Sequence, residues 1–179
     1  MSSNPKKLGA IFLIGPRGSG KTTVGQKLAQ KTGLPFLDLD QELTKKLGTS
    51  IAEFVKLKGW EAFRRHEKTL LFELGDTFLR KERAIVATGG GIVLDQANCQ
   101  FMKACGQVIY LKVEPKVLVL RLSIDPQIAQ RPALTTLDKE SEIKQVLAER
   151  EKLYLGCADM VVQASAPVQE VVIKIIEQI

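Results

Sequence analysis

The segment Gly-Pro-Arg-Gly-Ser-Gly-Lys-Thr at positions 15–22 constrains the fold of this chain more than any other feature. It matches the pattern G-x-x-x-x-G-K-[ST], follows the apolar run Ala10–Ile14 and precedes an amphipathic segment. In that context, glycines turn successive backbone N–H groups toward a phosphate, the lysine reaches the β- and γ-phosphates, and the last hydroxyl binds Mg²⁺. A glycine-rich turn without a ligand is the alternative, which the complete motif disfavours. We therefore predict a phosphate-binding loop (P-loop) that binds a nucleoside triphosphate with Mg²⁺.

The nucleotide is expected to contact the whole loop and the residue after it. The predicted contacts are Gly15, Pro16, Arg17, Gly18, Ser19, Gly20, Lys21, Thr22 and Thr23. Among them, Lys21 is predicted to be catalytic because its charge neutralises a transferring phosphoryl group, and Thr22 is predicted to be a metal ligand.

Length and composition indicate a single globular domain. The 179 residues are sized for one domain, or one domain with a small lid, and contain no apolar run near the roughly 18–20 residues of a membrane span. The N-terminus lacks the pattern of a signal peptide, so we expect a cytoplasmic protein. Cys99, Cys105 and Cys157 lack metal-ligand spacing and receive no role, and His66 alone excludes a multi-histidine metal site.

The net charge of +6 is compatible with nucleic acid or with small anions as ligands. Basic residues are mixed with acids along the chain, no basic run is longer than two residues, and only 6% of residues are aromatic. This pattern favours small anionic ligands over nucleic acid.

Short apolar runs alternate with segments of helical periodicity, which predicts βαβ units around a buried parallel sheet. Helical periodicity follows the P-loop, extends over residues 51–79, begins again at Pro115, surrounds Arg150, and closes the chain from Val168, with Pro167 at the first helical position. The predicted strands are Leu8–Ile14, Pro35–Leu39, Ala84–Thr88, Val108–Val113 and Asp159–Gln163.

Two carboxylates stand near the end of the second predicted strand. Asp38 and Asp40 are two residues apart, so in a strand both point to one face, at the edge where ligands bind to parallel α/β sheets. One can hold Mg²⁺ through water and the other can accept a hydroxyl proton from a phosphoryl acceptor. The structural alternative is that Asp40 caps a helix beginning at Gln41.

Arg64 is the first candidate for binding an anionic acceptor. Helical spacing puts it on one face with Trp60, Glu67 and Leu71, so it is partly turned toward the apolar side. Recognition of a substrate carboxylate and an ion pair with Glu67 are equally compatible with that position.

Three consecutive glycines, Gly89, Gly90 and Gly91, follow the predicted strand Ala84–Thr88. They expose backbone N–H groups at the edge of the sheet that also holds the P-loop, which predicts close approach of a ligand. A flexible turn is the alternative, although a turn needs fewer glycines.

The stretch 123–138 has two prolines and little periodicity, which is typical of a lid. Its one basic residue, Arg131, is predicted to reach the transferring phosphoryl group. Farther on, Arg150 shares a helix face with Val146, Leu147 and Tyr154, where it faces either an anionic ligand or a nearby acid.

In their order and spacing, the P-loop, Asp38-Leu39-Asp40, Phe63-Arg64, the three glycines, Arg131-Pro132 and Glu149-Arg150 resemble the shikimate kinase family over nearly the whole chain. The resemblance implies an α/β P-loop fold, with a five-stranded parallel sheet in a three-layer α/β/α arrangement and a lid. It implies one domain over residues 1–179, with substrate-binding helices at about 41–80 and the lid at about 123–138. It also implies ATP with Mg²⁺, transfer of the γ-phosphoryl group to the 3-hydroxyl of shikimate, and a monomer.

The same resemblance assigns roles residue by residue. Asp38 makes a water-mediated metal contact, and Asp40 binds the acceptor hydroxyl and is the base. Arg64, Arg150 and the glycine backbone bind shikimate, Arg121 stacks on adenine, and Arg131 is the lid arginine. The chain differs from many members in having Trp60 where they have Glu, and in a segment from Arg121 to Arg131 about three residues longer than the commonest spacing.

Two other functions belong to similar chains. Some transcription regulators have a shikimate-kinase-like domain that binds an aromatic acyl-coenzyme A, but the few polar residues before the first strand are too short for a helix-turn-helix. A gluconate-type kinase is the other alternative. Arg64, Arg150 and the glycine run favour a carboxylated ring over it.

Overall fold

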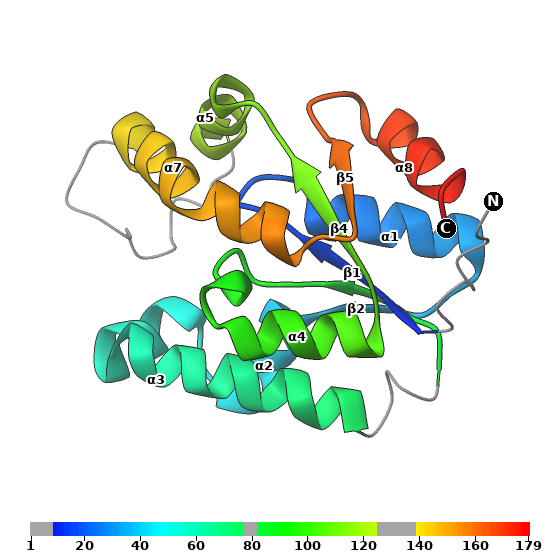
Figure 1. Ribbon diagram of the computed structural model, residues 1–179. Coiled ribbons are helices and arrows are strands. Elements are labelled where there is room, and N and C mark those ends of the chain that lie inside the picture. The colour runs from blue at the N-terminus through cyan, green and yellow to red at the C-terminus, as the bar shows by residue number, and fades with distance from the viewer. Residues whose placement is uncertain (1–8, 77–81, 125–138) are drawn as a thin grey trace.

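The computed structural model describes residues 9–76, 82–124 and 139–179. Within them, five parallel strands form one sheet in the order β2-β3-β1-β4-β5 (Figure 1). The strands are β1 (Ala10–Ile14), β2 (Phe36–Asp38), β3 (Ile85–Ala87), β4 (Gly106–Lys112) and β5 (Met160–Gln163). The predicted five-stranded parallel sheet is confirmed, with each strand close to its expected position; Leu8, predicted as the first strand residue, lies outside the described ranges.

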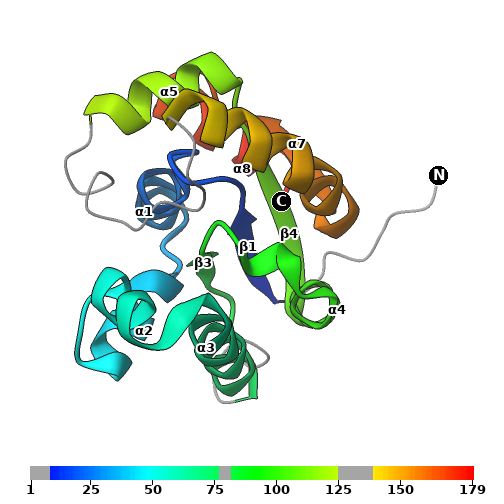
Figure 2. The same ribbon diagram turned by 90° about the vertical axis from the view of Figure 1, so that its left-hand side faces the viewer.

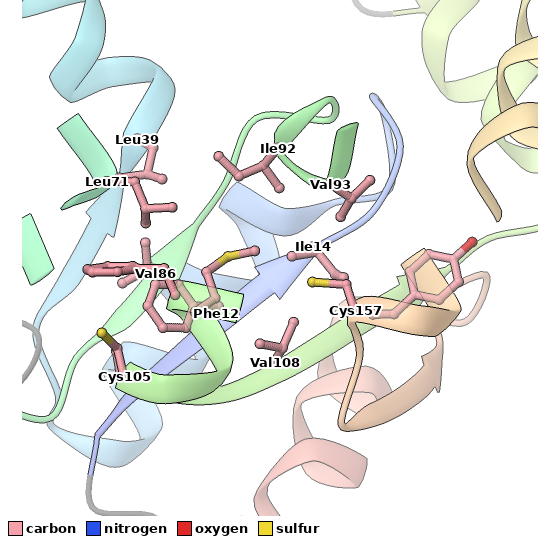
Figure 3. Close-up of a cluster of buried hydrophobic side chains, with 14 of the residues drawn as sticks. Phe12, Ile14, Leu39, Leu71, Val86, Ile92, Val93, Cys105, Val108 and Cys157 are labelled. Carbon is pink, nitrogen blue, oxygen red and sulfur yellow. The ribbon is translucent and has the colours of Figure 1, made fainter. Parts of the chain in front are cut away.

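The central strand β1 divides its side chains between two apolar cores. Ala10, Phe12 and Ile14 belong to one buried cluster, while Ile11 and Leu13 belong to the other. Because successive side chains of a strand point to opposite faces, a strand that is apolar throughout is buried on both sides. Figure 3 shows the first cluster, in which Phe12 and Ile14 lie among side chains from strands and helices.

Helices cover both faces of this sheet and make a three-layer α/β/α fold. Residues of α1 and α8 belong to the core on one face, and residues of α3 and α4 belong to the core on the other (Figure 1). No helix in the described ranges is long and apolar enough to cross a membrane. The helices are α1 (Lys21–Thr32), α2 (Leu39–Leu47), α3 (Ile51–Leu74), α4 (Gln96–Cys105), α5 (Pro115–Ile124), α7 (Lys139–Cys157) and α8 (Val168–Ile176), with a 3₁₀ turn η2 (Ile92–Leu94).

Two expectations about helix starts were wrong. Asp40 lies in the first turn of α2 rather than in a strand, because the Asp38 side chain caps the helix by accepting hydrogen bonds from the Asp40 and Gln41 amides. The cap is therefore Asp38 and not Asp40. At the end of the chain, Pro167 is the N-cap of α8, and the first helical residue is Val168.

The predicted substrate-binding region forms two helices with a small core of their own. Leu43 of α2 packs with Val55, Phe63 and Leu70 of α3, separately from the two cores of the sheet. Within α3, Gly59 has φ 79° and ψ 166°, which breaks the helix between its two halves. An L-residue rarely adopts this backbone conformation, so a glycine at the break is expected.

The predicted lid lies mainly outside the described residues. Its first two positions, Ser123 and Ile124, form the end of α5, and residues 125–138, including Arg131, are not among those described.

We predict that Gly106→Ala destabilises the protein. Gly106 of β4 pairs with Ala10 of β1, and a Cβ at position 106 would meet the carbonyl oxygen of Ala10. Because β1 is the central strand of the sheet, its backbone cannot shift to relieve this contact. Overpacking of this kind costs about 1–3 kcal/mol, measurable by urea unfolding.

Gly156→Ala is the matched control, because a Cβ there has no atom within 4 Å and the site is in a helix. Its free energy of unfolding should stay equal or rise slightly. Equal stability of the two variants would contradict the packing argument.

Candidate active site

A cavity of about 1140 Å³ lies where the strands of the sheet end at their carboxyl termini. Residues directly after β1, β2, β3 and β5 line it, and further lining residues come from α2, α3, α5 and α7. Figure 2 shows α2 and α3 on one side of β1 and α5 and α7 on the other. The cavity thus joins the P-loop to the helices that were predicted to bind an acceptor.

The P-loop wraps around the ammonium group of Lys21. Its Nζ donates hydrogen bonds to the carbonyl oxygens of Gly15 and Pro16, both at 2.8 Å, and to Ser19 Oγ at 3.4 Å. Gly18 and Gly20 have φ values of 79° and 91°, which non-glycine residues rarely adopt. The glycines of the motif therefore serve the sharp backbone path that turns N–H groups inward.

Thr22 and Asp38 form the side of the site next to the P-loop. Thr22 Oγ1 donates a 2.7 Å hydrogen bond to Asp38 Oδ2, while Asp38 Oδ1 caps α2. A hydroxyl and a carboxylate thus lie side by side at the start of α1. These oxygen ligands suit Mg²⁺, whose other ligands would be phosphate oxygens and water. The described residues contain no group of three His, Cys, Asp or Glu side chains that could hold a metal ion.

Arg64 pairs with Glu67 of the same helix, which was the alternative to ligand binding, and it also faces the three glycines. Its Nη1 donates a 2.6 Å hydrogen bond to Glu67 Oε2, and its guanidinium lies 5.4 Å and 5.2 Å from the ring centroids of Trp60 and Phe63. A Cβ added to Gly91 would meet the guanidinium. Arg64 is therefore held by an acid and two rings beside the glycine backbone.

Glu67 is the most deeply buried acid of the site, with 2% of its surface exposed. Burial raises the pKa of this carboxyl, and the positive charge of Arg64 opposes that shift. Its second oxygen, Oε1, has no hydrogen-bond partner among the described residues and points at Gly89, whose added Cβ would also lie 3.0 Å from Asp40 Oδ1. Asp40 and Glu67 thus approach the glycine backbone from the same side.

Two residues of α7, Tyr154 and Arg150, line the cavity, and Tyr154 contacts the glycine backbone. The Tyr154 hydroxyl donates a 2.5 Å hydrogen bond to the carbonyl oxygen of Gly90 and interacts with the Arg150 side chain. Burial raises the pKa of Tyr154 to about 12, so the hydroxyl stays protonated and remains a donor. The inward position predicted for Arg150 is confirmed by its place on the cavity wall.

Arg121 reaches back to the P-loop from α5. It donates hydrogen bonds to the carbonyl oxygens of Gly18 at 3.4 Å, Ser19 at 3.5 Å and Ala164 at 2.9 Å. Its guanidinium therefore lies beside the P-loop on the cavity wall.

The structure brings almost all of the predicted site residues together. Gly15 contributes its carbonyl oxygen to Lys21 rather than lining the cavity, and Arg131 lies outside the described residues. The predicted residues that line the cavity are Pro16, Arg17, Gly18, Ser19, Gly20, Lys21, Thr22, Thr23, Asp38, Asp40, Arg64, Gly89, Gly90, Gly91, Arg121 and Arg150.

Sequence reasoning missed two contributors to the site. Glu67 was considered only as a partner of Arg64, and Tyr154 only as an apolar neighbour of Arg150, yet both line the cavity and contact the glycine backbone. Helical spacing was the available signal, because each lies one turn from a predicted arginine on the same face.

Comparison with known proteins identifies the family. The family model described as "Shikimate kinase" matches residues 17–179 of this chain. The chain belongs to the shikimate kinase family. Shikimate kinase 2 of Sodalis glossinidius is 44% identical over 169 residues, which cover 94% of each chain. The chain is thus an ATP-dependent phosphotransferase of aromatic amino acid biosynthesis, as the sequence predicted.

Solved structures agree with this assignment. A shikimate kinase from Acinetobacter baumannii in complex with shikimate has a TM-score of 0.86 and 32% identity, covering 96% of this chain and 93% of that one. A gluconokinase from Sinorhizobium meliloti 1021 has a TM-score of 0.55 and 16% identity, covering 94% and 90%. The second likeness shows a shared fold alone.

We predict that Glu67→Gln changes how stability depends on pH. A carboxyl whose pKa is raised by folding contributes stability that is fully present below the ordinary value of 4.5 and is lost as pH rises through the raised value. Glutamine does not titrate, so the melting temperature of Glu67→Gln minus that of the wild type should be larger at pH 7 than at pH 4.

Glu61→Gln is the control for this titration, because Glu61 pairs with Arg65 on the same helix with 90% of its side chain exposed. The difference in melting temperature between Glu61→Gln and the wild type should be nearly the same at pH 4 and pH 7. For Glu67→Gln, a melting-temperature difference that shrinks or stays constant as pH rises would contradict the prediction. It would show that the ion pair with Arg64 outweighs the effect of burial on the Glu67 carboxyl.

Proposed function

We propose that this chain transfers the γ-phosphoryl group of ATP to the 3-hydroxyl of shikimate within the cavity described above, with Mg²⁺ as the metal. One observation supports this most: Arg64, Arg150 and the three glycines line the same cavity as the P-loop, with Asp38 and Asp40 also on its walls. The relative from Acinetobacter baumannii binds shikimate. In this proposal, residues 1–179 act as one domain and one monomer, with α2 and α3 on the acceptor side.

The P-loop binds the triphosphate. Its inward N–H groups and the start of α1 attract the phosphates, and Lys21 exchanges its bonds to loop carbonyls for bonds to phosphate oxygens. Because an ammonium group beside the transferring phosphoryl neutralises charge that develops in the transition state, Lys21 acts on the chemical step as well as on binding. Arg121, held beside Gly18 and Ser19, stacks on adenine.

Thr22 and Asp38 would hold the metal. Their 2.7 Å contact, which brings one hydroxyl and one carboxylate together beside the P-loop, supports this role. When bound, Mg²⁺ would neutralise part of the charge of the phosphates. Asp38 orients the Thr22 hydroxyl and, through water, the metal, while its other oxygen fixes the start of α2 and therefore the position of Asp40.

Positive charge and backbone amides bind the shikimate carboxylate. Arg64 and Arg150 line the same cavity as the glycine backbone, with the Arg64 guanidinium against Gly91. A guanidinium binds a carboxylate through parallel hydrogen bonds. Glu67 holds Arg64 in place, and Tyr154 holds the Gly90 carbonyl, so both sides of the pocket are fixed before the acceptor arrives. This preorganisation reduces the entropic cost of binding.

Asp40 accepts the proton of the acceptor hydroxyl. Its Oδ1 faces the glycine backbone, and the adjacent Asp38 holds the helix turn that carries it. A carboxylate within hydrogen-bond reach of the hydroxyl raises the electron density of the attacking oxygen as the phosphoryl group transfers. We also propose, from the sequence alone, that residues 123–138 form a lid and that Arg131 contacts the transferring phosphoryl group.

We predict different defects for the two aspartates. Asp40→Asn keeps its shape but accepts no proton, so kcat with shikimate should fall by about 10²- to 10⁴-fold while ATP affinity stays nearly constant. Asp38→Asn should instead raise the Mg²⁺ concentration needed for half-maximal rate. The measurement is a Mg²⁺ titration of the rate for both variants.

Asparagine is the informative replacement at Asp38 because it also caps helices well, so α2 keeps its start and the change falls on the metal side. Circular dichroism of both variants checks that the fold is kept. Indistinguishable Mg²⁺ titrations for the two variants would contradict the division of roles.

A further inference from the structure

The three glycines form a tight turn between β3 and η2. The Ile92 amide donates a 3.2 Å hydrogen bond to the carbonyl oxygen of Gly89, so Gly90 and Gly91 are the two central residues of the turn. Gly91 has φ −106° and ψ 9°, and neither central glycine has a positive φ. The third residue of a type I turn typically has φ and ψ of about −90° and 0°. The Gly90–Gly91 peptide is therefore the central peptide of a type I turn.

Glycine at both central positions gives this turn a second accessible form. A type II turn differs from a type I turn by rotation of the central peptide, and it needs a positive φ at the third residue. Glycine adopts that φ without strain, so Gly91 permits either form. The rotation exchanges the two sides to which the Gly90 carbonyl and the Gly91 N–H point. The glycines alone therefore do not fix which of these polar groups a ligand meets.

Tyr154 binds the central peptide in its type I form. Its hydroxyl donates a 2.5 Å hydrogen bond to the carbonyl oxygen of Gly90, and its side chain is fully buried, with the ring stacked on Tyr110 at a centroid distance of 5.0 Å. The peptide is trans, so the Gly91 N–H points in the direction opposite to that carbonyl. Rotation to the type II form would turn the carbonyl away from the phenol and break the hydrogen bond.

The Gly91 N–H is suited to a ligand. Gly91 is buried and lines the cavity, and within the described ranges its N–H donates no hydrogen bond to another residue. Buried backbone N–H groups rarely lack an acceptor, so this donor fits an oxygen of a bound molecule. The Arg64 guanidinium lies against the same glycine. Two positively polarised groups thus lie together on the cavity wall, which suits a carboxylate.

We propose that Tyr154 is a positioning residue for acceptor binding: it holds the Gly90–Gly91 peptide in the type I form, so that the acceptor carboxylate meets the Gly91 N–H and not the Gly90 carbonyl oxygen. The inference rests on the proposed function, because the orientation of the peptide matters most for a carboxylated acceptor. In the rotated form, the partial negative charge of the carbonyl oxygen would face the carboxylate and oppose its binding. The hydroxyl of Tyr154 therefore favours an anionic acceptor by acting through the backbone.

The first test is structural and does not depend on activity. Tyr154→Phe removes only the hydroxyl and keeps a ring that can stack on Tyr110. We expect a crystal structure of this variant to show the turn wholly or partly in the type II form, with φ of about +80° at Gly91. A structure in which Gly91 keeps its φ of −106° and the Gly90 carbonyl keeps its direction would overturn the proposal.

Tyr110→Phe is the matched control. It removes the hydroxyl from the other ring of the same stack, and Tyr110 lies on β4 and is not among the described residues that line the cavity. Its turn should keep the type I form, and its acceptor selectivity should equal that of the wild type. A type II turn in Tyr110→Phe would overturn the proposal, because it would show that the stack and not the Tyr154 hydroxyl sets the peptide.

The second test compares shikimate with its primary amide, which can donate a hydrogen bond to a carbonyl oxygen as well as accept one from an N–H. In Tyr154→Phe, kcat/KM for shikimate relative to the amide should fall about tenfold, as expected for one hydrogen bond to a charged group, while KM for ATP stays nearly constant. A general loosening of the fold would lower both acceptors alike. An unchanged ratio would overturn the positioning role, whereas a wild type that does not phosphorylate shikimate would contradict the proposed function and leave the structural test to decide the role of Tyr154.

Discussion

The backbone of Gly89, Gly90 and Gly91 is the point at which three parts of the protein meet without intervening side chains. Glu67 of α3 approaches the first glycine, Tyr154 of α7 binds the second, and the guanidinium of Arg64 lies against the third. A Cβ at Gly90 would also lie 3.2 Å from the Arg17 amide nitrogen of the P-loop. A Cβ at these positions would press on Glu67, on the P-loop backbone or on Arg64, so the close packing depends on three consecutive glycines.

The sequence predicted the sheet and the P-loop well because their signals are local. Apolar β-branched runs identify buried strands, and the P-loop pattern specifies its own strand–loop–helix context. Asp40 was misplaced because the start of α2 depends on whether the Asp38 side chain accepts a hydrogen bond from the Asp40 amide. The two-residue spacing of the aspartates does not reveal this hydrogen bond. Glu67 and Tyr154 escaped notice because their roles arise from contacts with glycines distant in the chain, and helical spacing gives only the face they occupy.

The helices α2 and α3 are anchored in two places. Leu39 of α2 and Leu71 of α3 belong to a cluster on the sheet, while Leu43, Val55 and Phe63 form a further small core between the two helices. Movement of these helices would carry Asp40 and Arg64 together, because both residues lie on that unit. On the opposite wall, α7 is tied to α4 by the hydrogen bond from Lys103 Nζ to the carbonyl oxygen of Gly156.

The residues that line the cavity determine which acceptor is phosphorylated, and ADP formation measures this choice directly. Purified protein with ATP and Mg²⁺ is given shikimate, gluconate, a nucleoside monophosphate or no acceptor, and ADP release is followed in a coupled assay. We predict rapid ADP release with shikimate and background release in the other three reactions. Release with gluconate or a nucleoside monophosphate as fast as with shikimate, or release that needs no acceptor, would contradict binding of a carboxylated ring between Arg64 and Arg150.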